Sequence, residues 1–338
     1  MSRRMLTVVA AGLLALALGV IGATLPVPFV ALGPGPTYDT LGTYEGTEII
    51  AVDGLPEYPT SGHLNMTTVS VTDRLSLFTS LYFWASGDRR VIPREAVFPS
   101  DRSDEQIQEE NAAQFESSES NAEVAAVGEL GLPVKVVVAG VVPDSPAVGV
   151  LEAGDEIVAV GGRPVASAAE VSESLADVFP GQTVAVTYRR AGVEDQADVV
   201  LGVSPDRAQG FLGVRPTVEA RDGQIDISLE GIGGPSAGLM FSLGVVDRLT
   251  PGELTGGRFI AGTGTIDPAG AVGPIDGVPF KMLKAREVGA EVFLVPDANC
   301  AEAVATVPDG LRLIRVTSLD DAINGLDALR EGRPTTPC

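Results

Sequence analysis

A charge-free apolar run near the N-terminus, residues 5–22, constrains this chain more than any other feature. A helix needs about 20 apolar residues to span a bilayer, and apolar residues continue here to Leu32. Arg3 and Arg4 precede the run, so the positive-inside rule keeps them in the cytoplasm and exports the rest. We therefore expect residues 1–32 to be a cytoplasmic stub and a single-pass transmembrane signal-anchor. A signal peptide cleaved at Ala23 is the alternative.

The 338-residue chain is acidic, with a net charge of −22. Binding to nucleic acid needs a basic face that neutralises phosphates, so we expect no nucleic-acid partner. Because 45% of the residues are hydrophobic, the chain can bury a sizeable core in two or three domains.

Histidine and cysteine are scarce. The sole histidine, His63, lies in a polar stretch and is expected at the surface, which argues against a Ser-His-Asp site. The two cysteines, Cys300 and Cys338, could form one disulfide in an exported protein, and the sequence leaves this open. We expect neither a metal site nor any other cofactor.

Residues 33–127 are predicted to form a β-rich N-terminal region that ends in an acidic helix. Apolar and polar residues alternate over 63–71, which favours a strand. Residues 103–127 are rich in Glu, Gln and Ala without Gly or Pro, which favours a helix with a solvated face. A docking surface is the alternative function of this charge run.

Residues 128–205 carry motifs that together resemble a PDZ domain: Ser145-Pro146-Ala147, Leu151-x-x-Gly154-Asp155-x-Ile157 and Gly161-Gly162. The resemblance implies a β-rich module that receives an extended peptide by strand addition. We expect the peptide beside residues 134–138, with the amides of Leu130, Gly131 and Leu132 capturing its terminal carboxylate. A mere spacer is the alternative.

Residues 206–338 alternate predicted strands and helices, as in an α+β or α/β unit. The strands fall at 225–229, 258–266, 271–275, 292–295 and 311–316, with the second and third joined as a hairpin. One helix covers 239–249 and another opens at Pro279 and ends near Gly289.

Ser236 lies in a glycine-rich segment, residues 231–238, between a predicted strand and a predicted helix. Unpaired amides and the positive end of the dipole at a helix N-terminus can hold an oxyanion, so Ser236 is a candidate nucleophile. An ordinary helix N-cap serine is the alternative.

The use of lysine supplies the second half of a site. Only three of the 23 basic residues are lysines, Lys135, Lys281 and Lys284, and two of them fall on one helix. Arginine stays protonated, whereas a desolvated lysine can act as a base. Lys281, between Phe280 and Met282, suits that role, and Lys284 suits a helix surface.

This region resembles the proteolytic domain of Lon. The resemblance rests on residues 234–238 (Gly-Pro-Ser-Ala-Gly), Thr263-Gly264, Gly270, Pro274-Ile275 and the helix of Lys281 through Val295-Pro296. It implies Ser236 as nucleophile, Lys281 as general base, and Gly234, Ala237 and Thr263 as supporting or oxyanion residues. Two positions depart from that family: Gly233 replaces an acidic residue, and Pro279 replaces a lysine.

The expected fold is therefore α+β, with an N-terminal transmembrane helix, a PDZ-like domain and a C-terminal Lon-type domain. The expected function is ATP-independent serine endopeptidase activity on protein or peptide substrates outside the cytoplasm. No lysine follows a glycine, so no phosphate-binding Gly-Lys step and no nucleotide are expected. The resemblance suggests a homo-oligomeric ring. The alternatives are a non-catalytic PDZ adaptor with a Lon-like oligomerisation scaffold and a purely structural envelope protein.

Overall fold

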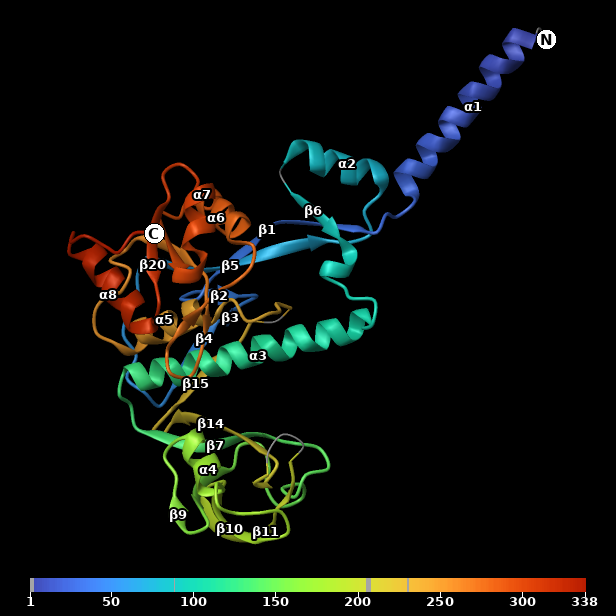
Figure 1. Cartoon of the computed structure of the whole chain (residues 1–338). Coiled ribbons are helices and arrows are strands. Elements are labelled where there is room, and N and C mark those ends of the chain that lie inside the picture. The colour runs from blue at the N-terminus through green and yellow to red at the C-terminus, as the bar shows by residue number, and fades with distance from the viewer. Residues whose placement is uncertain (1–2, 88, 205–207, 230) are drawn as a thin grey trace.

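The computed structural model describes residues 3–87, 89–204, 208–229 and 231–338. Helix α1 (Arg3–Thr24) extends away from the rest of the molecule (Figure 1). Its mean hydropathy is 2.4, and only 6% of its most apolar 18-residue window is buried. The predicted apolar helix is confirmed, and its length and composition are those of either a membrane-spanning helix or a signal sequence.

The larger sheet combines strands from both ends of the chain. Its order is β20-β19-β16-β5-β1-β6, in which β5, β16, β19 and β20 run parallel and β1 is antiparallel to its neighbours. The sequence predicts a separate region at residues 33–127, but its strands β1 and β5 complete the sheet of the C-terminal region. The strands are β1 (Phe29–Asp39), β5 (His63–Thr72), β6 (Arg90–Pro93), β16 (Phe259–Gly262), β19 (Val292–Pro296) and β20 (Arg312–Val316).

Both faces of this sheet are covered by helices, and we call the sheet with its helices the body. Successive strand residues point to opposite faces: Ile260 and Leu294 pack in one core, whereas Ala261 and Phe293 pack in another. The first face carries α3 (Asp104–Glu129), α5 (Gly238–Leu249) and α8 (Leu319–Arg330). The second carries α6 (Val278–Glu287) and α7 (Cys300–Thr306).

Helix α3, predicted as an acidic helix with a solvated face, also has a buried face. Ser103 and Gln106 form a capping box at its start. Phe115 packs edge-on against Phe241 of α5 with ring centroids 5.7 Å apart, and the Ser242 hydroxyl donates to the Ala122 carbonyl at 3.1 Å. Helix α3 is therefore part of the body's core.

A smaller sheet, the module, lies on the other side of α3 (Figure 1). Its order is β11-β10-β8-β7-β14, with β9 paired to β8, and α4 (Ala168–Ser174) lies beside it. Val138, Ile157, Val160 and Val186 are buried in its core. The strands are β7 (Val134–Val141), β8 (Glu156–Val160), β9 (Arg163–Pro164), β10 (Thr183–Arg190), β11 (Val193–Val200) and β14 (Val214–Ala220).

The boundary between the module and the body differs from the sequence-based one. The predicted boundary at 205/206 lies outside the described residues. Strand β14, which falls in the segment predicted as proteolytic domain, pairs with β7 along its length, from Val214 opposite Val141 to Ala220 opposite Val134. The module therefore takes its last strand from beyond that boundary.

Short elements complete the fold. The predicted strand 258–266 is in fact split: β16 enters the large sheet, and only β17 (Thr265–Ile266) forms a hairpin, with β18 (Val272–Gly273). Cys300 and Cys338 form a disulfide. The other elements are β2 (Thr43–Tyr44), β3 (Thr47–Glu48), β4 (Ile50–Asp53), β12 (Gly202–Val203), β13 (Gly210–Phe211), β15 (Gln224–Ile227), α2 (Leu77–Ser86), η1 (Arg94–Ala96) and η2 (Asp297–Asn299).

Candidate active site

Ser236 lies one residue before the N-cap of α5, which is Ala237. Thr263 and Gly264, the two residues between β16 and β17, hydrogen-bond to its main chain. The Ser236 carbonyl accepts hydrogen bonds from the Gly264 amide and from the Thr263 hydroxyl, both at 3.0 Å. The interruption of the predicted long strand at this point thus positions the serine.

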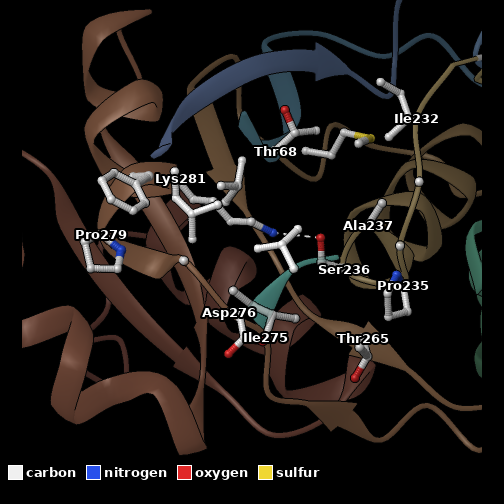
Figure 2. A pocket seen from close by; sticks show the side chains of 18 of the residues that line it. Thr68, Ile232, Pro235, Ser236, Ala237, Thr265, Ile275, Asp276, Pro279 and Lys281 are labelled. Atoms are coloured by element: carbon white, nitrogen blue, oxygen red, sulfur yellow. Dashed lines mark hydrogen bonds between the residues drawn. The ribbon is translucent and has the colours of Figure 1, made fainter. Parts of the chain in front are cut away.

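Lys281 reaches Ser236 from the first turns of α6. Its Nζ donates to Ser236 Oγ at 2.7 Å (Figure 2) and to Thr263 Oγ1 at 2.9 Å. The lysine is only 2% exposed, and Met282 beside it is fully buried, whereas Phe280 is half-buried. Sequence reasoning therefore selected three residues, Ser236, Thr263 and Lys281, that the fold brings into contact.

Burial governs the charge of this lysine. Loss of solvation lowers the pKa of Lys281 from 10.5 to about 7, and the negative charge of Asp276 opposes that shift. Among the described residues, Lys135 pairs with Glu219 and Lys284 with Glu287, whereas Lys281 has no carboxylate within ion-pair distance. A substantial fraction of Lys281 is therefore a neutral amine near pH 7.

The amides of Gly234 and Ala237, two of the residues expected to be supporting or oxyanion residues, differ in whether they are already hydrogen-bonded. The amides in the first turn of a helix have no intrahelical partner, and Ala237, at the start of α5, lines the cavity. The Gly234 amide, by contrast, donates to the Asn111 carbonyl at 2.9 Å. Of the two roles expected for Gly234, supporting or oxyanion, this hydrogen bond fits the supporting one.

Helix α3 packs against residues 231–238, the glycine-rich segment that holds Ser236 and that we call the nucleophile loop. The sequence analysis did not predict this contact. Ser118 Oγ donates to the Pro235 carbonyl at 3.1 Å. A Cβ at Gly233 would lie 2.9 Å from the Cβ of Asn111, so close packing of α3 explains why glycine occupies this position. The spacing of Phe115, Ser118 and Ala122 on one helical face was the available signal.

Ser236, Ala237 and Lys281 line a cavity of about 1230 Å³ in the body. The nucleophile loop, the start of α6 and strands β1, β5 and β6 form its walls. Pro279, the second departure from the Lon pattern, lies in the first turn of α6 and lines this cavity. Apolar side chains dominate the walls, including Leu32, Tyr38, Met66, Ile92, Phe115 and Ile232.

His63 is not part of the site. It pairs with Phe259 at the start of β16, whereas Thr263 follows the end of that strand. Its Nδ1 lies 2.6 Å from Asp39 Oδ2, and its side chain is half exposed. The surface position expected for His63 is confirmed.

Two protein-family models match separate parts of the chain. Residues 230–327 match the model of the Lon protease (S16) C-terminal proteolytic domain, and residues 109–201 match that of the PDZ domain. The chain joins a PDZ domain to a Lon-type proteolytic domain. Residues 109–201 are thus similar to a PDZ domain and residues 230–327 to the proteolytic domain of Lon proteases.

Curated Lon proteases are similar to this chain over part of its length. A Lon protease of Azospirillum brasilense is 31% identical over 155 residues, which are 43% of this chain and 18% of that protein. Lon protease 1 of Myxococcus xanthus is 27% identical over 161 residues, 46% of this chain and 20% of the relative. The chain therefore spans about a fifth of the length of these relatives.

Solved PDZ domains are similar to the module. The PDZ domain of an SdrC-like protein from Listeria monocytogenes is 29% identical, covers 24% of this chain and 86% of its own, and gives a TM-score of 0.23. The PDZ domain of an SdrC-like protein from Listeria innocua is 27% identical, with coverages of 24% and 92% and a TM-score of 0.23.

In the PDZ domain, the residues expected to capture a carboxylate are already engaged. The amides of Leu130, Gly131 and Leu132 donate to carbonyls of Ala126, Gly128 and Val127 and so close the end of α3. Leu130 and Leu132 also pack against the body's core. The expected carboxylate site at these residues is corrected, because their N–H groups are not free.

The expected peptide-binding edge is also occupied. Strand β7 has β8 on one side and β14 on the other, so it is not an edge strand. The edge of the sheet next to β7 is β14, which contacts both α3 and α4. In the described chain, β14 and not β7 is therefore the strand whose outer side has no paired strand at this end of the sheet.

Ladder geometry identifies the free groups of β14. The N–H and C=O of Val138 bond toward β8, and Val136 pairs with Ile157 on that side too. Since directions alternate along a strand, the residues opposite these valines, Pro216 and Val218, present their backbone to the open edge. Pro216 has no N–H to bond and suits an edge position.

Proposed function

We propose that the protein is a membrane-anchored, ATP-independent serine endopeptidase with Ser236 as nucleophile and Lys281 as general base. The observation that carries this proposal is the 2.7 Å contact between Lys281 Nζ and Ser236 Oγ, made by a lysine that is 2% exposed. Both halves of a nucleophile-base pair are thus within reach, and burial favours the neutral amine that a base requires.

Acylation follows from this arrangement. The neutral amine of Lys281 accepts the Ser236 hydroxyl proton while Oγ bonds to the carbonyl carbon of the scissile peptide. Negative charge moves to the carbonyl oxygen, where the Ala237 amide at the start of α5 is the candidate donor. When the C–N bond breaks, the Lys281 ammonium returns its proton to the leaving amine.

Deacylation uses the same groups with water as the nucleophile. Lys281 accepts a proton from water, water oxygen bonds to the ester carbon, and Ser236 Oγ leaves and regains the proton. Thr263 orients the amine throughout, because its hydroxyl donates to the Ser236 carbonyl and presents a lone pair to Lys281 Nζ. Thr263 is thus a positioning residue.

A location outside the cytoplasm is supported by two features. Arg3 and Arg4 precede the apolar part of α1, which favours a cytoplasmic N-terminus and an exported body. The Cys300–Cys338 disulfide joins the C-terminal tail to α7, and disulfides persist mainly in oxidising compartments.

We assign peptide binding in the PDZ domain to the open edge of β14. Main-chain hydrogen bonds to Val218 would add the peptide as a strand, independent of most of its side chains. The PDZ domain would thereby deliver polypeptide to the Lon-type domain. The homo-oligomeric ring suggested by the family resemblance is part of this proposal.

Cleavage of an unfolded protein tests the proposal. The full chain in detergent micelles is expected to cleave casein without nucleotide, and Ser236→Ala to lose activity by about 10³-fold or more. Strict dependence on ATP would contradict the nucleotide-independent mechanism. Absence of cleavage, together with no labelling of Ser236 by a serine-reactive probe, would favour the non-catalytic adaptor.

A further inference from the structure

Helix α2 turns its apolar side away from the protein. Its ten residues, Leu77–Ser86, carry no charge, and its large apolar side chains form one exposed stripe, whereas Ser80 is buried. A helix on a water-soluble surface has the opposite orientation. The exposed fractions are 45% for Leu77, 50% for Phe78, 50% for Leu81, 63% for Tyr82 and 76% for Trp84.

The exposed stripe of α2 lies next to the C-terminal end of α1. Gly22 is the one buried residue of α1, and a Cβ there would lie 2.8 Å from the Phe78 ring. Gly22 is two residues from the end of α1 at Thr24. Figure 1 shows α2 beside that end. Because α1 is proposed above to span the membrane, α2 lies at the depth of its last turn, where hydrocarbon meets headgroups.

Residues just after α1 are hydrogen-bonded to residues just before α2, although strands β1 to β5 separate the two helices along the chain. The Val27 amide, just after α1, donates to the Leu75 carbonyl at 2.8 Å, and Pro26 forms a bridge with Ser76, the N-cap of α2. Leu25, 61% exposed, extends the apolar surface between them. The height of α2 above the end of α1 is therefore set by the main chain.

The side chains also suit an interface. Tyr82 and Trp84 have an apolar body and a polar atom, and such residues concentrate where lipid meets water. Exposed Arg74 lies just before α2, where a guanidinium can reach lipid phosphate. A helix with this composition and orientation matches one that lies in the plane of a membrane surface.

We propose that α2 is an interfacial helix whose outward stripe lies in the lipid surface beside α1. This inference rests on the membrane anchor of the proposed function and adds a second contact with the bilayer. Helix α2 joins β5 to β6, and Thr68 and Ile92 of these strands line the cavity of Ser236. Seating α2 in lipid fixes the height and orientation of that cavity above the membrane.

Trp84 is the sole tryptophan and reports on this contact directly. The full chain is reconstituted in phosphatidylcholine vesicles with or without brominated acyl chains, which quench nearby indoles. We expect bromolipid to remove more than about half of the Trp84 emission, because an interfacial helix places its apolar face among the upper acyl segments. Aqueous acrylamide should quench it weakly.

A matched control moves the reporter to the PDZ domain. Phe179 is 56% exposed there, so Trp84→Phe combined with Phe179→Trp should show emission quenched by acrylamide and not by bromolipid. Tyr82→Glu on the outward stripe should reduce bromolipid quenching of Trp84 at least about twofold, since a carboxylate resists entry into lipid.

Flotation of the vesicles separates this inference from the anchor. If the protein floats with vesicles but Trp84 remains open to acrylamide and unaffected by bromolipid, the anchor stands and the interfacial helix is wrong. If Trp84 is shielded from both quenchers, protein covers the stripe, as in a dimer, and the inference is again overturned. Failure to float removes the anchor and the inference together.

Discussion

The Lon-type body and the PDZ domain differ in the kind of polar group that each holds for its proposed task. The body encloses its sheet between helices and keeps its polar side chains, Lys281 and Thr263, buried at the end of β16. The PDZ domain leaves the edge strand β14 without a strand beyond it in the described chain. The site in the body thus consists of buried polar side chains, whereas the candidate site in the PDZ domain consists of main-chain groups at the edge of a sheet.

The difference shows what each task requires. General base chemistry needs an amine that burial has made neutral, and this lowers stability because the charged form is disfavoured. The folded pKa of Lys281 lies below its unfolded value of 10.5, so the penalty is fully present below about pH 7 and disappears by pH 10.5. Strand addition requires no comparable loss of folding stability, because the main-chain groups at the edge of β14 are solvated in the folded protein.

The largest expected effect comes from exchanging the two lysines of α6 for arginine. Lys281→Arg should lower kcat/KM by about 10³-fold or more, because guanidinium stays protonated at every relevant pH. Lys284→Arg, whose side chain pairs with Glu287, should keep most activity. Normal cleavage by Lys281→Arg together with an inactive Lys284→Arg would move the site to the other lysine.

The next effect concerns the orientation of the amine. Thr263→Val keeps the shape of the side chain but removes the hydroxyl between Lys281 Nζ and the Ser236 carbonyl, so kcat should fall roughly 10- to 100-fold. Thr40→Val is the matched control, because that buried hydroxyl donates to the Leu64 carbonyl and Thr40 does not line the cavity of Ser236. An equal loss in both variants would indicate a general packing defect.

Peptide binding at the outer edge of β14 should weaken when a single main-chain amide is removed. Val218→Pro removes an N–H that faces the open edge and leaves the β7 ladder intact, so affinity for an extended peptide should fall about tenfold. Val218→Ala keeps the amide and serves as the control. Titration of the full chain with a fluorescent peptide measures both. Unchanged affinity in Val218→Pro would exclude strand addition at this point of β14.

The candidate catalytic residues could be predicted because their signals are local. Ser236 follows a glycine-rich turn before a helix, and Lys281 stands out because lysine is rare in this chain. Thr263 was found only through the resemblance to Lon. These positions depend on short segments whose helices and turns the sequence indicates directly.

The peptide edge could not be predicted because strand pairing is not local. The pairing of Val214 with Val141 joins segments far apart in sequence, and nothing in either segment specifies that partner. The amides at Leu130–132 were a different case. Gly131 has φ +61 just after α3, a common helix ending in which the following amides bond back to the helix. A glycine just after a helical segment is the sequence signal of this ending.

The smallest expected effect lies where α3 contacts the PDZ domain. Burial, followed by the charges of Glu219 and Asp226, raises the pKa of Glu123 from 4.5 to about 8. Because the folded pKa is the higher one, its contribution to stability is present below pH 4.5 and is lost as pH rises through about 8. Glu123→Gln should therefore leave Tm unchanged near pH 4.5 and raise it at pH 9 by roughly 3 °C. An equal shift at both pH values would contradict burial of this carboxyl.

The pH dependence of kcat/KM tests the central claim most directly, because it reports the ionisation of the base in the free enzyme. With casein and the full chain, activity should rise through a single ionisation near pH 7, the pKa that burial gives Lys281. The Lys284→Arg variant should show the same midpoint. A midpoint near 10.5, or activity independent of pH, would mean that Lys281 is not the buried neutral base of Ser236.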